Sequence, residues 1–179
     1  MKLSKVILIA ADEKDLELLL TEAKDRLKST MDIADNLTNR SMTFFSFTVA
    51  ALTTGIGYIS TNFSLEANTV VLTPIMIILS VICSLLKNNI VPNEYFSIGS
   101  DPETIAVDGM FINLAKRRPR FYLLAHLIEA YNARIVNNRT ENEKKASSLE
   151  LAMFWAYIIP AAALTRYLLF FFFVEPFSK

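Results

Sequence analysis

The sequence predicts an all-α integral membrane protein, and three observations lead to that fold class. Apolar residues make up 53% of the 179 positions and the mean hydropathy is positive, which is unusual for a soluble domain. The charges are segregated: between Ser41 and Leu86, Glu66 is the only Asp, Glu, Lys, Arg or His. In other parts of the chain, apolar residues recur at steps of three and four, the period of one helix face.

Three segments are long and apolar enough to cross the hydrocarbon core of a bilayer, which takes about 20 residues of helix. They are residues 41–60, 67–86 and 149–174. Residues 61–66, TNFSLE, join the first two without a Lys or Arg, so we expect residues 41–86 to form an antiparallel transmembrane hairpin. The alternative is a soluble protein with these helices in its core, but so small a chain has too little polar sequence to surround them.

The basic residues predict the topology. Many of them lie in residues 87–148, some close to the ends of apolar segments: Lys87, Lys116, Arg117, Arg118, Arg120, Arg134, Arg139, Lys144 and Lys145. By the positive-inside rule, residues 1–40 and 87–148 face the cytoplasm. The third span, 149–174, then leaves the short tail of residues 175–179 outside.

Residues 12–40 predict an amphipathic cytoplasmic helix. Its apolar stripe consists of Leu16, Leu19, Leu20, Ala23, Leu27, Met31, Ala34 and Leu37. The stripe either packs on the protein's own cytoplasmic helices or binds a membrane surface; mixed charges on the polar face favour packing. The apolar patch within residues 1–11 is shorter than the core of a signal peptide and acids follow it, so we expect it in the mature chain.

The region 87–148 predicts a short helix followed by a long one. Ser100 and Glu103 form a capping box ahead of a helix over about 101–114. From Pro119 no helix breaker occurs before Pro160, so one helix of roughly 80 Å continues into the third span. Its seam is Phe121, Leu124, Ile128, Tyr131, Ile135, Asn138, Asn142, Lys145, Leu149, Ala152 and Ala156. The three polar members indicate either a hydrated section or one that sets the packing register.

The residues give no indication of catalysis. His126 is the only histidine and Cys83 the only cysteine, so a metal cluster or a catalytic triad cannot be assembled within one chain. No phosphate-binding glycine loop or metalloprotease motif occurs. We therefore expect no enzyme activity, no cofactor and no metal. Because 18 basic residues balance 18 acidic ones, we also expect no nucleic-acid partner.

Small and hydroxyl-bearing residues recur within the hairpin. The first span carries Thr43, Ser46, Ala50, Thr53, Thr54 and Gly57 along one side, and the second carries Thr73, Ser80 and Ser84. Such a stripe commonly packs against another helix, because small side chains let backbones approach closely. Alternatively, in an oligomer the hydroxyl groups line an aqueous path and replace part of an ion's hydration shell.

Basic residues at two places need separate explanations. Arg166 lies inside the third apolar segment, where a central charge costs about 2.5–3.5 kcal/mol. It either lines a polar cavity or extends to the interface from a helix that has nearly completed its crossing. The cluster of Lys116, Arg117, Arg118 and Arg120 predicts contact with the phosphates of anionic lipids, or of a phosphate-bearing ligand.

The order of these parts resembles the SLATT and Pycsar-effector (PycTM-like) membrane proteins of bacterial anti-phage defence. The similarity covers about residues 15–164, including the broken stretch VPNEYFSIGSDPETI and the charged helix HLIEAYNARIVNNRTENEKKASSLELAMFWA. It implies an effector that forms homo-oligomers and permeabilises the bacterial inner membrane once infection is sensed. The family supplies no catalytic residues to assign.

The resemblance also implies a partner, either a nucleotide second messenger or a separate cytoplasmic sensor protein. No nucleotide-sensing domain is recognisable in these residues, so we expect the separate sensor. The main alternative function is a non-conducting membrane anchor or assembly subunit that recruits a cytoplasmic partner. A lipid-modifying enzyme ranks third.

Overall fold

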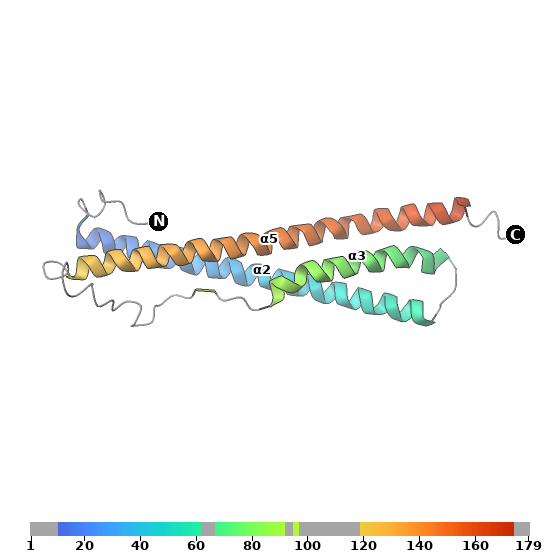
Figure 1. The fold of residues 1–179 in the computed structure, drawn as a ribbon, viewed down its shortest axis with the longest axis horizontal. Coiled ribbons are helices and arrows are strands. Elements are labelled where there is room, and N and C mark those ends of the chain that lie inside the picture. The colour runs from blue at the N-terminus through green and yellow to red at the C-terminus, as the bar shows by residue number, and fades with distance from the viewer. Residues whose placement is uncertain (1–10, 62–66, 92–94, 97–118, 174–179) are drawn as a thin grey trace. The chain divides into compact units, whose positions relative to one another are not determined.

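A computed structural model of the chain describes residues 11–61, 67–91, 95–96 and 119–173. Three α-helices account for nearly all of these residues: α2 (Glu13–Thr61), α3 (Ala67–Ile90) and α5 (Pro119–Phe173) (Figure 1). Within the described ranges there is no strand, so the predicted all-α class is confirmed. The short helix expected over 101–114 lies outside the described residues.

Helix α2 begins with a reciprocal cap. The backbone N–H of Asp15 donates to Asp12 Oδ1 at 2.8 Å, and the N–H of Asp12 donates to Asp15 Oδ2 at 3.0 Å. Each carboxylate thereby satisfies a backbone donor that the first helical turn leaves unpaired. No proline or glycine follows until Gly55, so the predicted amphipathic helix and the first predicted span form one uninterrupted helix of 49 residues.

Helix α5 runs for 55 residues from Pro119, as its sequence predicts, and continues through Pro160. Proline suits the first position of a helix, where its missing N–H is not needed. Helix α3 has 24 residues and also contains a proline, Pro74. Among the described residues, these three helices are all long and apolar enough to cross a membrane, which agrees with an integral membrane protein.

The chain divides into two compact units, each of which takes part of α2 and part of α5. Unit 1 comprises Met1–Asp35 and Asn93–Glu143. Unit 2 comprises Asn36–Pro92 and Lys144–Lys179, and includes α3.

In unit 1 the amphipathic part of α2 packs on the first half of α5. The buried cluster consists of Leu16, Leu20, Ala23, Leu27, Phe121, Leu124, Ala125, Ile128, Tyr131 and Ile135. The apolar stripe of α2 therefore packs on another helix of the same chain, as the first of the two interpretations predicts. One member departs from the prediction: Leu19 is 39% exposed, because Leu16, Leu20 and Ala23 already fill that side of the helix.

Buried amides continue the α5 seam in unit 1. Asn142 Nδ2 donates to the backbone carbonyl of Thr30 at 2.8 Å, and Asn138 Nδ2 donates to Thr30 Oγ1 at 3.3 Å. Tyr95 donates its hydroxyl proton to Asn142 Oδ1 at 3.2 Å. Because Asn138 is only 1% exposed, these residues fit the second alternative, a section that sets the packing register, and not the hydrated one. Such paired amides favour one helix register over others.

In unit 2 the hairpin packs on the second half of α5. The buried cluster consists of Ile78, Ile82, Leu86, Leu149 and Ala152. Gly55 is buried against α3, where the thioether of Met76 occupies the space that a Cβ would fill. Ala156, the last residue of the predicted seam, is partly buried against this cluster.

A polar group of four residues closes the core of unit 2. Asn89 Nδ2 donates to Ser41 Oγ at 3.1 Å and to the backbone carbonyl of Lys145 at 2.9 Å. Lys145 is only 5% exposed, and its Nζ donates to Thr38 Oγ1 at 3.0 Å. Lys145 is therefore packed rather than hydrated, and no buried side-chain polar atom among the described residues lacks a hydrogen-bond partner.

Candidate functional site

The candidate site begins with the outward face of α2 in unit 2, which we define as Thr43, Ser46, Ala50, Thr53, Thr54 and Gly57. All six residues are exposed. Nothing lies within 4 Å of a Cβ added at Gly57. The face is therefore uncovered by the described part of the chain.

The seam that does pack lies on the opposite side of the same helix segment. Ser41 is fully buried, Thr48 is 3% exposed, and Gly55 is buried against α3. At about 100° per residue, these positions lie roughly half a turn from the centre of the outward face. The first predicted span therefore carries small and hydroxyl residues on two faces, of which the chain itself uses one.

All four hydroxyl groups of the outward face bond to their own helix. Thr53 Oγ1 donates to the carbonyl of Val49, and Thr54 Oγ1 donates to the carbonyl of Ala50, both at 2.9 Å. Thr43 and Ser46 make equivalent bonds one turn back, also at 2.9 Å. Each hydroxyl proton is therefore satisfied even next to lipid, while the oxygen can still accept a further hydrogen bond.

The predicted hydroxyl residues of α3 are exposed as well. Ser80 donates its hydroxyl proton to the carbonyl of Met76 at 2.8 Å, and Ser84 and Thr73 lie on the surface. The buried α3 positions are instead Ile78, Leu79, Ile82, Leu86 and the amide-bearing Asn89. The predicted hydroxyl residues of both hairpin helices are therefore exposed, whereas Ser41 and Thr48, which the prediction did not include, are buried.

Arg166 is exposed on α5, and no ion pair to it exists among the described residues. The helix continues to Phe173, only about 10 Å further on at 1.5 Å per residue. Arg166 also lies roughly 25 Å beyond Leu149, near the far edge of a hydrocarbon core of about 30 Å. These lengths favour a guanidinium that extends to the interface over one in the middle of the bilayer.

Among the predicted phosphate-contacting cluster, Arg120 alone is described, since Lys116, Arg117 and Arg118 lie outside the described residues. Arg120 forms an exposed ion pair with Glu17 in unit 1. Along α5 it precedes Leu149 by roughly 40 Å, so it does not lie where the third predicted span begins. Contact of this cluster with lipid or ligand phosphate stays a prediction.

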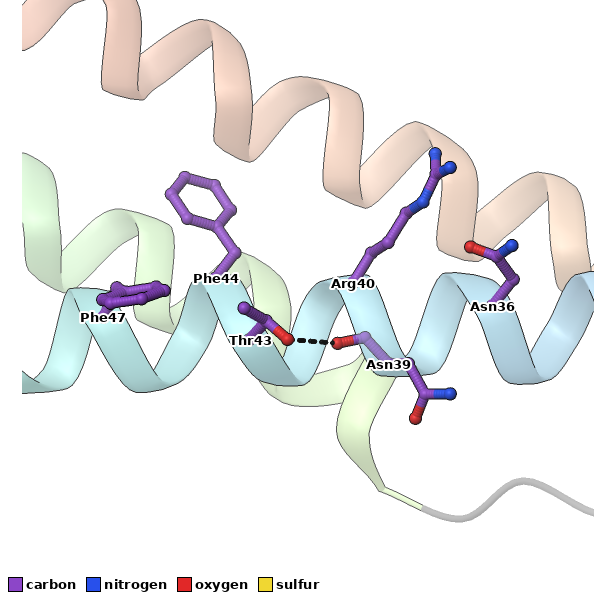
Figure 2. A pocket seen from close by; sticks show the side chains of 6 residues that line it. All are labelled: Asn36, Asn39, Arg40, Thr43, Phe44 and Phe47. Carbon is purple, nitrogen blue, oxygen red and sulfur yellow. Dashed lines mark hydrogen bonds between the residues drawn. The ribbon is translucent and has the colours of Figure 1, made fainter.

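A groove on α2 lies where the charged part of the helix meets its apolar part. It has a volume of about 690 Å³ and is lined by Asn36, Asn39, Arg40, Thr43, Phe44 and Phe47. Figure 2 shows Asn36, Arg40 and Phe44 extending from one side of α2, with Asn39, Thr43 and Phe47 in the neighbouring row. The dashed line marks the bond from Thr43 to the carbonyl of Asn39. We call this site the Arg40 groove.

A smaller groove of about 310 Å³ lies in unit 1. Its lining consists of Arg26, Ser29, Thr30, Ile33, Arg139, Asn142 and Glu143. Thr30 and Asn142 already bond to one another, and the Glu143 carboxylate offsets part of the charge of the two guanidinium groups. This groove consequently offers a weaker anion site than its two arginines suggest.

The described residues hold no recognisable catalytic arrangement. His126 is partly buried in α5, and no three potential metal ligands converge in the described ranges. Burial raises the pKa of the Tyr95 hydroxyl, and the Glu141 and Asp35 carboxylates raise it further. A tyrosine with a raised pKa stays protonated and donates to Asn142, which is a structural role.

Comparisons of the chain with family models, with curated proteins and with solved structures give no match. The class that the fold defines is therefore general: an all-α protein with three helices of transmembrane length and hydropathy. Any narrower function has to be argued from the residues.

Sequence patterns did not indicate Ser41, Thr48, Asn89 or the Arg40 groove as parts of the site. Ser41 and Thr48 lie outside the chosen stripe, although they follow a seven-residue spacing that continues to Gly55. Asn89 follows Lys87 and Asn88 at the end of an apolar run, where polar residues usually meet solvent. Arg40 could have been found as the last charge before the first uncharged segment.

Proposed function

We propose that this protein self-associates in a membrane through the outward face of α2 and, on activation, permeabilises that membrane. The single observation that carries the proposal is an exposed small-residue face on an apolar helix whose opposite face already packs on its own chain. Small residues let transmembrane helices approach closely, and hydroxyl oxygens accept bonds from a neighbouring chain or from water.

The resemblance to SLATT and PycTM-like effectors supports a role for this activity in bacterial anti-phage defence at the inner membrane. Under this proposal residues 1–40 and 87–148 lie in the cytoplasm and residues 41–60, 67–86 and 149–174 cross the bilayer. Activation comes from a separate cytoplasmic sensor protein or a nucleotide second messenger. The protein is not an enzyme, and it needs no cofactor.

One observation favours a second function, that of a non-conducting membrane anchor. The hydroxyl protons of the outward face are satisfied by backbone carbonyls, so the face is compatible with lipid and does not require water. In that case the cytoplasmic helices recruit a partner protein, and the outward face contacts acyl chains only.

Expression of the full chain in bacteria distinguishes the two functions. We expect induction to a high level, which drives self-association by mass action without the activating signal, to collapse the membrane potential, as reported by a voltage-sensitive dye. Gly57→Leu should abolish the collapse, since a bulky side chain there meets nothing within its own chain yet blocks close approach of another helix. Ala51→Leu, at an exposed position beside the face, is the matched control and should depolarise like the unmodified chain.

Normal polarisation at high expression, together with capture of one stoichiometric cytoplasmic partner, would establish the anchor function instead. Depolarisation that Gly57→Leu and Ala51→Leu leave equally intact would rule out the outward face as the surface responsible.

A further inference from the structure

The Arg40 groove changes from polar to apolar along α2. Asn36, Asn39 and Arg40 form its first part, Thr43 lies in the middle, and Phe44 and Phe47 form its last part. The six residues occupy two adjacent rows with a spacing of four, as Figure 2 shows, so they line one continuous strip of surface. This strip extends about 16 Å along the helix.

The polar part offers hydrogen-bond donors and one fixed positive charge. Arg40 is exposed, and among the described residues no ion pair to it exists. Its guanidinium presents parallel N–H groups that match two oxygens of one phosphate. Figure 2 shows Asn36 on the same side of α2 as Arg40, and its exposed side-chain amide can donate to the same group, whereas Asn39 extends from another side of the helix.

The apolar part offers two phenyl rings on the side of the uncharged segment. Phe44 is half-buried and packs on the core of unit 2, so its ring has a fixed support. Phe47 is 72% exposed, which leaves a large apolar surface uncovered. A ligand that fits both parts must carry a phosphate at one end and hydrocarbon at the other.

We propose that the Arg40 groove binds one phospholipid, with its phosphate diester on Arg40 and an acyl chain along Phe44 and Phe47. Arg40 is the last charged residue before the uncharged segment that begins at Ser41, so the polarity of the groove matches the order of headgroup and tail in a leaflet. A soluble phosphate compound would leave Phe47 exposed. This inference rests on the membrane crossing of α2 in the proposed function, but not on permeabilisation.

Native mass spectrometry of the full chain, released from detergent in the presence of phosphatidylglycerol, tests the proposal. We expect one retained lipid per chain, with retention several-fold lower for Arg40→Gln and partly restored for Arg40→Lys, which keeps the charge without the planar fork. Phe47→Ala should also lower retention. Lys28→Gln, at an exposed basic residue of unit 1 that lines neither groove, is the matched control and should retain the lipid fully.

Two further probes identify the ligand chemistry. Diacylglycerol, which lacks the phosphate, should not be retained, and glycerol 3-phosphate, which lacks the acyl chains, should not displace the lipid. Equal retention by Arg40→Gln and the unmodified chain, at equal helix content by circular dichroism, would overturn the proposal. Displacement by glycerol 3-phosphate would also overturn it, in favour of a soluble phosphate ligand.

Carbonate extraction of membranes that contain the same variants keeps this test separate from the proposed function. If the chain is extracted as a peripheral protein, the membrane crossing fails and both proposals fall. If the chain stays in the membrane but Arg40→Gln has no effect on retention, the lipid site alone is refuted.

Discussion

Two faces of α2 carry similar residues but have different surroundings. The inward face buries Ser41, Thr48 and Gly55 against the rest of unit 2. The outward face exposes Thr43, Ser46, Ala50, Thr53, Thr54 and Gly57. Hydroxyl and small residues within an apolar segment therefore do not by themselves define a packing surface; the neighbouring residues on other helices decide which face is covered.

The inward face is specified by partners that lie far away in sequence. Ser41 accepts a hydrogen bond from Asn89 of α3, and Gly55 faces Met76. On the outward face the hydroxyl donors reach only their own backbone. Substitutions on the two faces should therefore differ in their effect on the stability of a single chain.

The largest difference is expected between Gly55→Leu and Gly57→Leu. Leucine at position 55 overpacks the contact with α3, although the flexible end of the Met76 side chain can move aside, and should lower the free energy of unfolding by about 2 to 3 kcal/mol. Leucine at position 57 enters open space and should leave it nearly unchanged. Unfolding of the detergent-solubilised chain by denaturant titration measures both. Equal destabilisation would show that the two faces are not distinct.

Asn89→Ala should have the next largest effect. It removes the two hydrogen bonds from Asn89 Nδ2 and leaves the buried Ser41 oxygen without that donor, at a cost of about 2 kcal/mol. Asn88→Ala, at an exposed neighbouring position, is the control and should change stability little. A comparable loss for Asn88→Ala would contradict a special role of the buried amide, since alanine is the better helix former at both positions.

Ser41→Ala and Ser46→Ala compare one hydroxyl from each face. Ser41→Ala removes the acceptor of Asn89 and should lower the free energy of unfolding by about 1 kcal/mol. Ser46→Ala removes only a bond to the same helix and should cost less than about 0.5 kcal/mol. Thermal unfolding followed by circular dichroism gives both values. The reverse order would contradict the assignment of the inward face.

The smallest effect is expected for Tyr95 in unit 1. Its hydroxyl group donates to the buried side-chain amide of Asn142. Its pKa is raised in the folded chain, so its contribution to stability is complete below pH 10 and is lost as the pH rises through the folded-state pKa. Tyr95→Phe should therefore show a weaker decline in stability above pH 10. Identical pH profiles for the two proteins would argue against this contribution.

The helices could be predicted from the sequence because their signals are local. The α5 seam from Phe121 to Ala152 keeps one spacing over its whole length, and every member of it is buried. Two adjacent predicted segments merged into α2 because no breaker separates Arg40 from Ser41. Leu19 was misplaced because three nearby residues already supply the buried contact.

The candidate site could be predicted only in part, because it depends on contacts between helices. The hydroxyl stripe was recognised, but its spacing fits a covered face as well as an exposed one. The hydrogen bond from Asn89 to Ser41 identifies the covered face of α2. It joins residues 48 positions apart, which no local pattern indicates. The Arg40 groove was missed because hydropathy averages over a window and hides where a charge adjoins aromatic rings.

Cysteine cross-linking in intact membranes tests most directly whether the outward face contacts a second copy. In a Cys83→Ser background, Ala50→Cys lies at the centre of the outward face, and Val49→Cys lies on an adjacent exposed side of the same turn. Mild oxidation should give a covalent dimer for Ala50→Cys in severalfold excess over Val49→Cys, since a disulfide requires close Cα atoms. Equal dimer yields, or none for Ala50→Cys, would contradict self-association through this face.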